Sequence, residues 1–99
     1  MSTQQASEPT LKEWQAGAAN VIEFAEAAYQ RGELGDAVAI GFRLTATVHA
    51  MKRAHQAGAR KIAREYAEQV GIDFDLLDQQ VGARIYEHVQ ISRLEAGLS

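Results

Sequence analysis

The chain of 99 residues contains no cysteine, a single proline and no long uncharged apolar run. The lack of cysteine excludes disulfide bonds and thiolate metal ligands, and it fits a reducing compartment. The N-terminal residues carry neither the basic nor the apolar block of a signal peptide, and no apolar stretch approaches the ~18 residues that span a membrane. We therefore expect a soluble, cytoplasmic protein that makes no contact with a membrane.

Scarce proline and 18 alanines predict an all-α fold, because alanine is the strongest helix former and proline breaks helices. Pro9 lies before any expected helix, and we expect residues 1–9 to form a disordered tail. Residues 10–99 are expected to form one helical domain, a small bundle of three to four helices. A bundle of this size has a thin margin of stability, which favours a homodimer.

The first helix is predicted to begin near Leu11, because Thr10 and Glu13 have the spacing of a capping box. It should end at the glycines of the segment 32–35. Small and apolar residues recur along it at the a and d positions of three heptads, which lets a second helix approach closely. This seam is either the core of the chain or a dimer contact, and we favour the core. The seam comprises Leu11, Trp14, Ala18, Val21, Ala25 and Ala28.

The segment from Val38 to Val48 alternates in a way that is typical of a strand. A wider window favours a helix, because apolar residues recur every three or four positions from Leu44 to Val70. We therefore expect either one long helix over residues 37–70 or two helices broken near Gly58. An interior glycine weakens a helix by about 1 kcal/mol relative to alanine without necessarily ending it.

The last helix is predicted to follow Gly71, with Asp73 as its N-cap and an end near Ala96, where Gly97 should close it. For the histidines at positions 55 and 88 we favour a place in the core or at an interface. The expected inner face of this helix comprises Phe74, Leu77, Val81, Ile85, His88 and Val89.

Charge is unevenly distributed along the chain. No acidic residue occurs between Ala37 and Arg64, whereas six lysines and arginines give this stretch a formal charge of +6. The whole chain has a formal charge of −3, so the remaining residues sum to −9. Such segregation predicts one surface that attracts anions and another that repels them.

No residue pattern indicates catalysis or a metal site. No two histidines lie three or four positions apart, as two metal ligands on one helix face would. The serines lie near the ends of the chain, outside any nucleophile turn, and no phosphate loop is recognisable. Two carboxylate pairs, Glu23 with Glu26 and Asp75 with Asp78, are expected to be solvated. We predict that the protein is not an enzyme and has neither a metal nor a cofactor.

The basic stretch and its apolar neighbours predict a protein-binding surface, because aromatic residues, methionine and arginine are enriched at interfaces. The function we favour is that of an inhibitor or antiactivator, which sequesters a regulatory protein by docking on its acidic patch. The segment 41–55 resembles helices of many bacterial regulatory proteins without identifying a family. His49 should extend the basic surface. The expected contact residues are Phe42, His49, Met51, Lys52, Arg53, Arg60 and Arg64.

Two alternatives remain open. The segment 43–64 could bind nucleic acid through its phosphates, which the negative net charge and the low aromatic content of 7% disfavour. A helical dimer could instead bind a small anionic ligand at its junction. Salt separates nucleic-acid binding from protein binding, because phosphate contacts weaken steeply with salt whereas an apolar interface persists.

Overall fold

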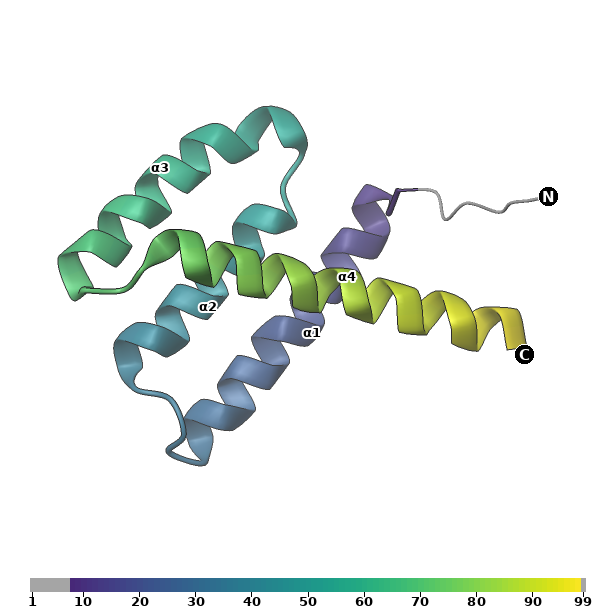
Figure 1. The fold of residues 1–99 in the computed structure, drawn as a ribbon, viewed down its shortest axis with the longest axis horizontal. Coiled ribbons are helices and arrows are strands. Elements are labelled where there is room, and N and C mark those ends of the chain that lie inside the picture. Colours follow the sequence, from purple (N-terminus) through teal and green to yellow (C-terminus); the bar gives the residue numbers. More distant parts are fainter. Residues whose placement is uncertain (1–7, 99) are drawn as a thin grey trace.

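Four helices make up the part of the chain that the computed structural model describes, residues 8–98. They are α1 (Leu11–Gln30), α2 (Asp36–His49), α3 (Arg53–Val70) and α4 (Phe74–Leu98). This confirms the predicted all-α class. Helices α1 and α2 form a hairpin, α3 lies beside α2, and α4 crosses both α1 and α2 (Figure 1). The molecule is only 18 Å thick along its shortest axis, which corresponds to two layers of helices.

The helix ends follow from local sequence. The Thr10 hydroxyl accepts a hydrogen bond from the Glu13 backbone amide at 3.1 Å, and the Glu13 carboxylate accepts one from the Thr10 amide at 2.9 Å. Gly71 closes α3 in the left-handed conformation, with a φ of 77°. The Asp73 carboxylate accepts a hydrogen bond from the Leu76 amide at 3.2 Å. The capping box, the glycine stop and the aspartate N-cap are therefore confirmed.

The break between α2 and α3 corrects both versions of the expected second helix. The helices separate at residues 50–52, and Gly58 lies inside α3, where a Cβ would meet no atom within 4 Å beyond the adjoining backbone of its own helix. The His49 side chain turns towards α4, and the Ala50 carbonyl accepts a hydrogen bond from the Gln15 side chain at 3.3 Å. Two contacts distant in sequence thus lie at the break. Helix α4 also continues to Leu98 instead of ending near Ala96, a difference within the usual fraying of a helix end.

The main core lies where α4 crosses α1 and α2. Its fully buried side chains include Val21, Ala46, Val81 and Ile85. The predicted inner face of α4 is buried except for His88, which is half-buried. Along the heptad seam of α1, Leu11 is exposed and Trp14 is half-buried. The other four seam residues are buried within the chain's own core: Ala18, Val21, Ala25 and Ala28.

Glycines bring α4 unusually close to its neighbours. A Cβ on Gly17 of α1 would lie 2.7 Å from the Ile85 side chain and 3.1 Å from the Ile85 carbonyl oxygen. A Cβ on Gly41 of α2 would lie 3.0 Å from the Leu77 side chain. The helices therefore cross at positions where only glycine fits without a shift of its neighbours.

A second, smaller cluster attaches α3. It contains Val48, Ala63, Ala67 and Phe74, so α3 itself contributes only two fully buried residues, both alanines. Ile62 of this helix is 67% exposed. Helix α3 consequently depends on polar contacts as well as apolar burial for its position.

Candidate functional site

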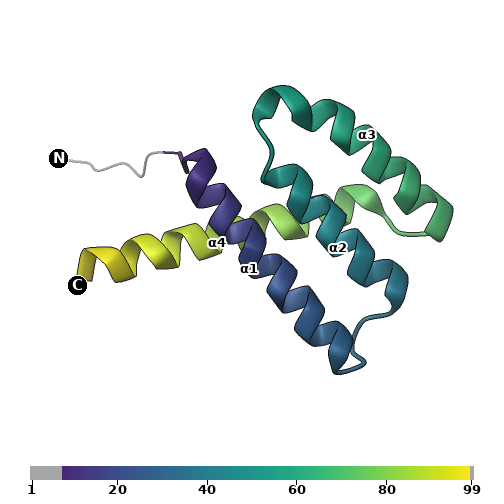
Figure 2. The ribbon, with the colours of Figure 1, turned by 180° about the vertical axis from the view of Figure 1, so that it is seen from behind.

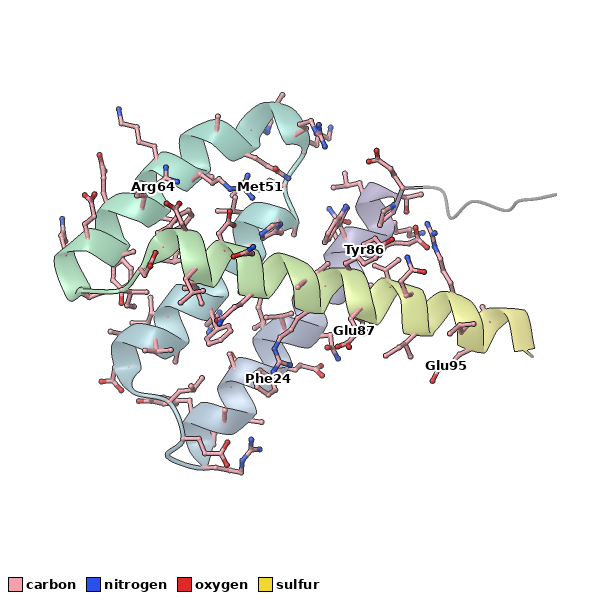
Figure 3. The ribbon with its side chains drawn as sticks, viewed as in Figure 1. Phe24, Met51, Arg64, Tyr86, Glu87 and Glu95 are labelled. Atoms are coloured by element: carbon pink, nitrogen blue, oxygen red, sulfur yellow. The ribbon has the colours of Figure 1, made fainter. Side chains whose placement is uncertain are left out.

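The seven predicted contact residues differ in exposure and in the partners that they contact. Phe42 is half-buried and packs edge to face against Phe24, with ring centroids 6.3 Å apart. Met51 is half-buried in the turn between α2 and α3, whereas Lys52 and Arg53 are exposed at the start of α3. The remaining three, His49, Arg60 and Arg64, make polar contacts with α4. Arg64 is labelled on α3 in Figure 3.

Asp78 of α4 joins three helices. One of its carboxylate oxygens lies 2.9 Å from Nε2 of His49, and the other accepts a hydrogen bond from Nε of Arg60 at 3.2 Å. The Gln56 side chain accepts a further hydrogen bond from Arg60 at 3.1 Å. The Trp14 ring stacks on His49, with centroids 5.9 Å apart. The Asp78 side chain is 24% exposed, so these partners satisfy a largely buried carboxylate.

Arg64 makes a parallel contact one turn away. It donates a hydrogen bond to Asp75 at 2.9 Å, and its guanidinium lies over the Phe74 ring, 4.8 Å from the centroid. Two expectations are therefore wrong: Asp78 is not a solvated carboxylate, and His49 points towards α4 instead of extending a basic surface. The sequence contained a signal for these ion pairs. Arg60 and Arg64 lie on one helix, and Asp75 and Asp78 follow just beyond the next turn.

The free part of the basic stretch is smaller than its formal charge suggests. Among residues 8–98, no ion pair involves Lys52, Arg53 or Lys61. Lys52 is the N-cap of α3 and makes no side-chain capping bond, and the first turn holds no acidic residue. Cations at this end oppose the helix dipole, so the start of α3 is electrostatically unfavourable.

The polar cluster brings a histidine, an arginine and an aspartate together. A histidine oriented by an aspartate can act as a base when a nucleophile lies beside it. Here the His49 ring stacks on Trp14, contacts the Asp78 carboxylate and lies beside Gly82. Within residues 8–98 no three potential ligands converge to hold a metal ion. The cluster is a structural joint between α2, α3 and α4.

None of the helices of the described chain combines the length and the apolar character required to cross a lipid bilayer.

A groove on the face that α4 leaves uncovered is the best-formed candidate site. It has a volume of about 760 Å³, and its lining residues all belong to α1 and α2. These two helices lie in front of α4 in Figure 2. Ala25, Ala27, Ala39 and Ile40 give it apolar walls, and Ile40 is 45% exposed. Small residues on both helices keep the groove open. Apolar hollows of this size are typical of binding sites.

The rim of the groove is acidic. It carries the carboxylates of Glu23, Glu26 and Asp36 against a single guanidinium, that of Arg43. Arg43 already pairs with Glu26 across the two helices at 3.1 Å. The Asp36 carboxylate, by accepting a hydrogen bond from the Tyr29 hydroxyl, raises the pKa of that hydroxyl. The net charge of the rim is therefore negative. The groove is thus opposite in charge to the basic surface predicted from the sequence.

Sequence reasoning singled out Glu23 with Glu26 as a pair but did not place them on a groove. Finding the site requires knowing which side of α1 and α2 is covered by α4. The sequence contains one signal for the groove. Alanines and glutamates alternate in the second half of α1, and the glutamates point away from the core.

Comparison with models of protein families, with curated proteins and with solved structures finds no match for this chain.

Proposed function

We propose that this protein is a small helical regulator that binds another protein and sequesters it, in the manner of an inhibitor or antiactivator. The observation that carries the proposal is the open groove between α1 and α2, with its apolar walls and acidic rim. In this proposal the protein acts by covering a surface of its target that the target uses to bind other molecules. The cysteine-free sequence supports a cytoplasmic place of action. A homodimer, expected from the small size of the bundle, is retained as a separate proposal.

The occupant of the groove is an amphipathic helix of the target, with an apolar face flanked by lysines or arginines. Such helices bind grooves through apolar side chains spaced one turn apart. The alanines of the walls allow close approach, and Ile40 supplies an apolar contact. Glu23 and Asp36 on the rim favour positive flanking residues, because opposite charges accelerate encounter and exclude partners of the wrong sign.

This proposal moves the binding surface away from the one expected from the sequence. Arg60 pairs with the largely buried Asp78, and Arg64 pairs with the exposed Asp75, so an acidic patch on a target would compete with these two pairs. The same pairing weakens the nucleic-acid alternative, because each phosphate contact needs an available cation. The groove also repels a small anionic ligand.

Two synthetic amphipathic peptides with the same leucine face test the proposal, one flanked by lysines and the other by glutamates. Fluorescence anisotropy at physiological salt should show binding of the lysine peptide alone. Ile40→Ser and Glu23→Lys should each weaken binding at least tenfold, which corresponds to about 1.4 kcal/mol. Ile62→Ser on α3 is the matched control, because Ile62 is exposed and lies outside the groove.

Equal binding of both peptides would refute the charge selection. If Ile40→Ser and Ile62→Ser had the same effect on affinity, the groove would not be the site.

A further inference from the structure

We infer that the ion pair between Glu26 of α1 and Arg43 of α2 closes the groove, and that a lysine or arginine of the incoming helix opens it by replacing Arg43 on Glu26. We call this ion pair the groove latch. Its role rests on the function proposed above, because it controls entry to the same groove. The groove latch adds a requirement that an acidic rim alone does not impose, which is a cation at one defined position of the incoming helix.

The groove latch joins the two walls of the groove. Glu26 belongs to the α1 wall and Arg43 to the α2 wall, and the Arg43 guanidinium donates a hydrogen bond to the Glu26 carboxylate at 3.1 Å. The Glu26 and Arg43 side chains are 55% and 59% exposed, so the contact lies towards the solvent and not in the floor of the groove. A helix that packs between the walls therefore meets the groove latch as it enters.

A second polar contact between the walls differs from the groove latch in its charge. Three residues further along α1 than Glu26, the Tyr29 hydroxyl donates a hydrogen bond to the Asp36 carboxylate of α2. The Tyr29 hydroxyl is uncharged, so the negative charge of Asp36 stays available to an approaching cation. The charge of Glu26, in contrast, is compensated by Arg43. Glu26 therefore becomes available to a ligand only when one cation is exchanged for another.

Few contacts hold Arg43 in place. Within residues 8–98, its guanidinium forms an ion pair with Glu26 alone. Arg60, by comparison, contacts both carboxylate oxygens of Asp78 as well as the Gln56 side chain, in a pair that is only about a quarter exposed. Exposed pairs contribute little to stability, because water and salt screen both charges. The groove latch can therefore open without disturbing the fold, whereas the Arg60 pair is part of the joint between α3 and α4.

Exchange at Glu26 discriminates between incoming side chains. A lysine or arginine leaves the carboxylate paired, so binding loses only the screened contact with Arg43. An apolar or acidic residue at the same place breaks the pair without replacing it, and leaves Glu26 against an apolar or like-charged neighbour. Such arrangements disfavour the wrong partner more strongly than a screened pair favours the right one. The groove latch should therefore reject helices that have the right apolar face but lack the cation.

Removal of the cation of the groove latch provides the test, with the lysine-flanked peptide described above as the ligand. Arg43→Met keeps much of the side-chain length and removes the charge. Fluorescence anisotropy should show a rise in affinity of about threefold to fivefold, the range that an exposed ion pair sets. Circular dichroism should show an unchanged helix content, because the Arg43 side chain is more than half exposed.

Arg31→Met is the matched control. Arg31 pairs with Glu33 at 2.8 Å, with side chains that are 53% and 56% exposed, and neither residue lines the groove. The variant removes the same charge from a pair of the same kind, so the affinity for the peptide should change less than about twofold.

A double-variant cycle separates the groove latch from simple charge repulsion. If Arg43 acts through Glu26, Arg43→Met should have a much smaller effect when it is introduced into Glu26→Gln, because the pair is already broken there. An equal rise in affinity in both backgrounds would show that Arg43 only repels the peptide, which overturns the inference. A rise of the same size in Arg31→Met, or a fall in Arg43→Met, would overturn it as well.

Failure of the groove latch and failure of the proposed function give different results. Equal affinities of the wild-type and Arg43→Met chains for the lysine peptide would refute the groove latch and leave the proposed function standing. If neither chain bound the peptide, the proposed function itself would be refuted, and the groove latch with it. The expected pattern is binding by both chains, tighter for Arg43→Met, with Ile40→Ser weakening the binding of each.

Discussion

The two core clusters of this molecule are held together by different forces. Where α4 crosses α1 and α2, the buried residues include Val21, Val81 and Ile85, and burial of each such side chain contributes about 1.5–3 kcal/mol. Helix α3 contributes only Ala63 and Ala67 as fully buried residues, at roughly 0.8 kcal/mol per methyl-sized group. The first cluster is a close apolar crossing, and the second depends on carboxylates of α4. Helix α3 should therefore be the first element to detach when the fold is perturbed.

The strongest test of the apolar crossing is Gly17→Ala. The new methyl would lie 2.7 Å from the Ile85 side chain and 3.1 Å from its backbone carbonyl, so the helices must move apart. We expect the free energy of unfolding to fall by about 2–3 kcal/mol, at the upper end for overpacked cores. Urea denaturation followed by circular dichroism measures this change. A loss below about 0.5 kcal/mol would mean that α1 and α4 do not cross as closely as the structure indicates.

The corresponding test of the polar attachment is Asp78→Ala. It removes the carboxylate that His49 and Arg60 share, which leaves His49 with the backbone carbonyl of residue 78 and Arg60 with Gln56 as partners. We expect a loss of about 2 kcal/mol, with hydrogen exchange accelerating in α3 and remaining slow in the segments of α1 and α4 that cross.

Asp75→Ala is the matched control, because the Asp75 side chain is 82% exposed and its pair with Arg64 should contribute less than about 1 kcal/mol. If hydrogen exchange accelerated uniformly in all four helices of the Asp78 variant, the two clusters would be one cooperative unit.

Some helix ends could be predicted from the sequence and one could not, because they depend on different kinds of contact. The capping box at Thr10, the stop at Gly71 and the N-cap at Asp73 depend on neighbouring residues, so local patterns predicted them. The separation of α2 and α3 at residues 50–52 involves neither glycine nor proline, and the apolar periodicity continues across it. The last residue of α2, His49, contacts Asp78, which lies 29 residues away in sequence, and no local pattern encodes such a contact.

The candidate sites illustrate the same limit. The basic stretch was visible in the charge pattern, but its pairing with α4 depends on how α3 and α4 meet. The position of the groove depends on which face of the α1–α2 hairpin is covered by α4. Because α4 has apolar residues on both sides, its sequence does not show which of its sides packs against the hairpin.

A smaller, opposite effect is expected from Gly58→Ala. Beyond the adjoining backbone of its own helix, nothing lies within 4 Å of the position of the new Cβ, and the residue is inside α3. Alanine should raise the free energy of unfolding by about 0.5–1 kcal/mol, because it reduces the freedom of the unfolded chain and favours the helix. The comparison with Gly17→Ala uses the same chemical change at a crowded and an open position. Destabilisation at both positions would show that α3 packs against something absent from the described chain.

The smallest expected effect lies at the edge of the main crossing, where Glu13 of α1 meets Arg93 of α4. The two side chains approach to 2.7 Å, and the hydrogen bond from Arg93 lowers the pKa of Glu13 from 4.5 to about 2. The folded chain then binds fewer protons than the unfolded chain between these values, so the contribution to stability is complete above about pH 4.5 and is lost as the pH falls towards 2. Glu13→Gln should remove this part of the pH dependence of the urea midpoint, and Arg93→Gln should reduce it because the largest cause of the pKa shift disappears. A pH profile unchanged in both variants would show that the pair is solvated and that the apolar crossing alone joins α1 to α4.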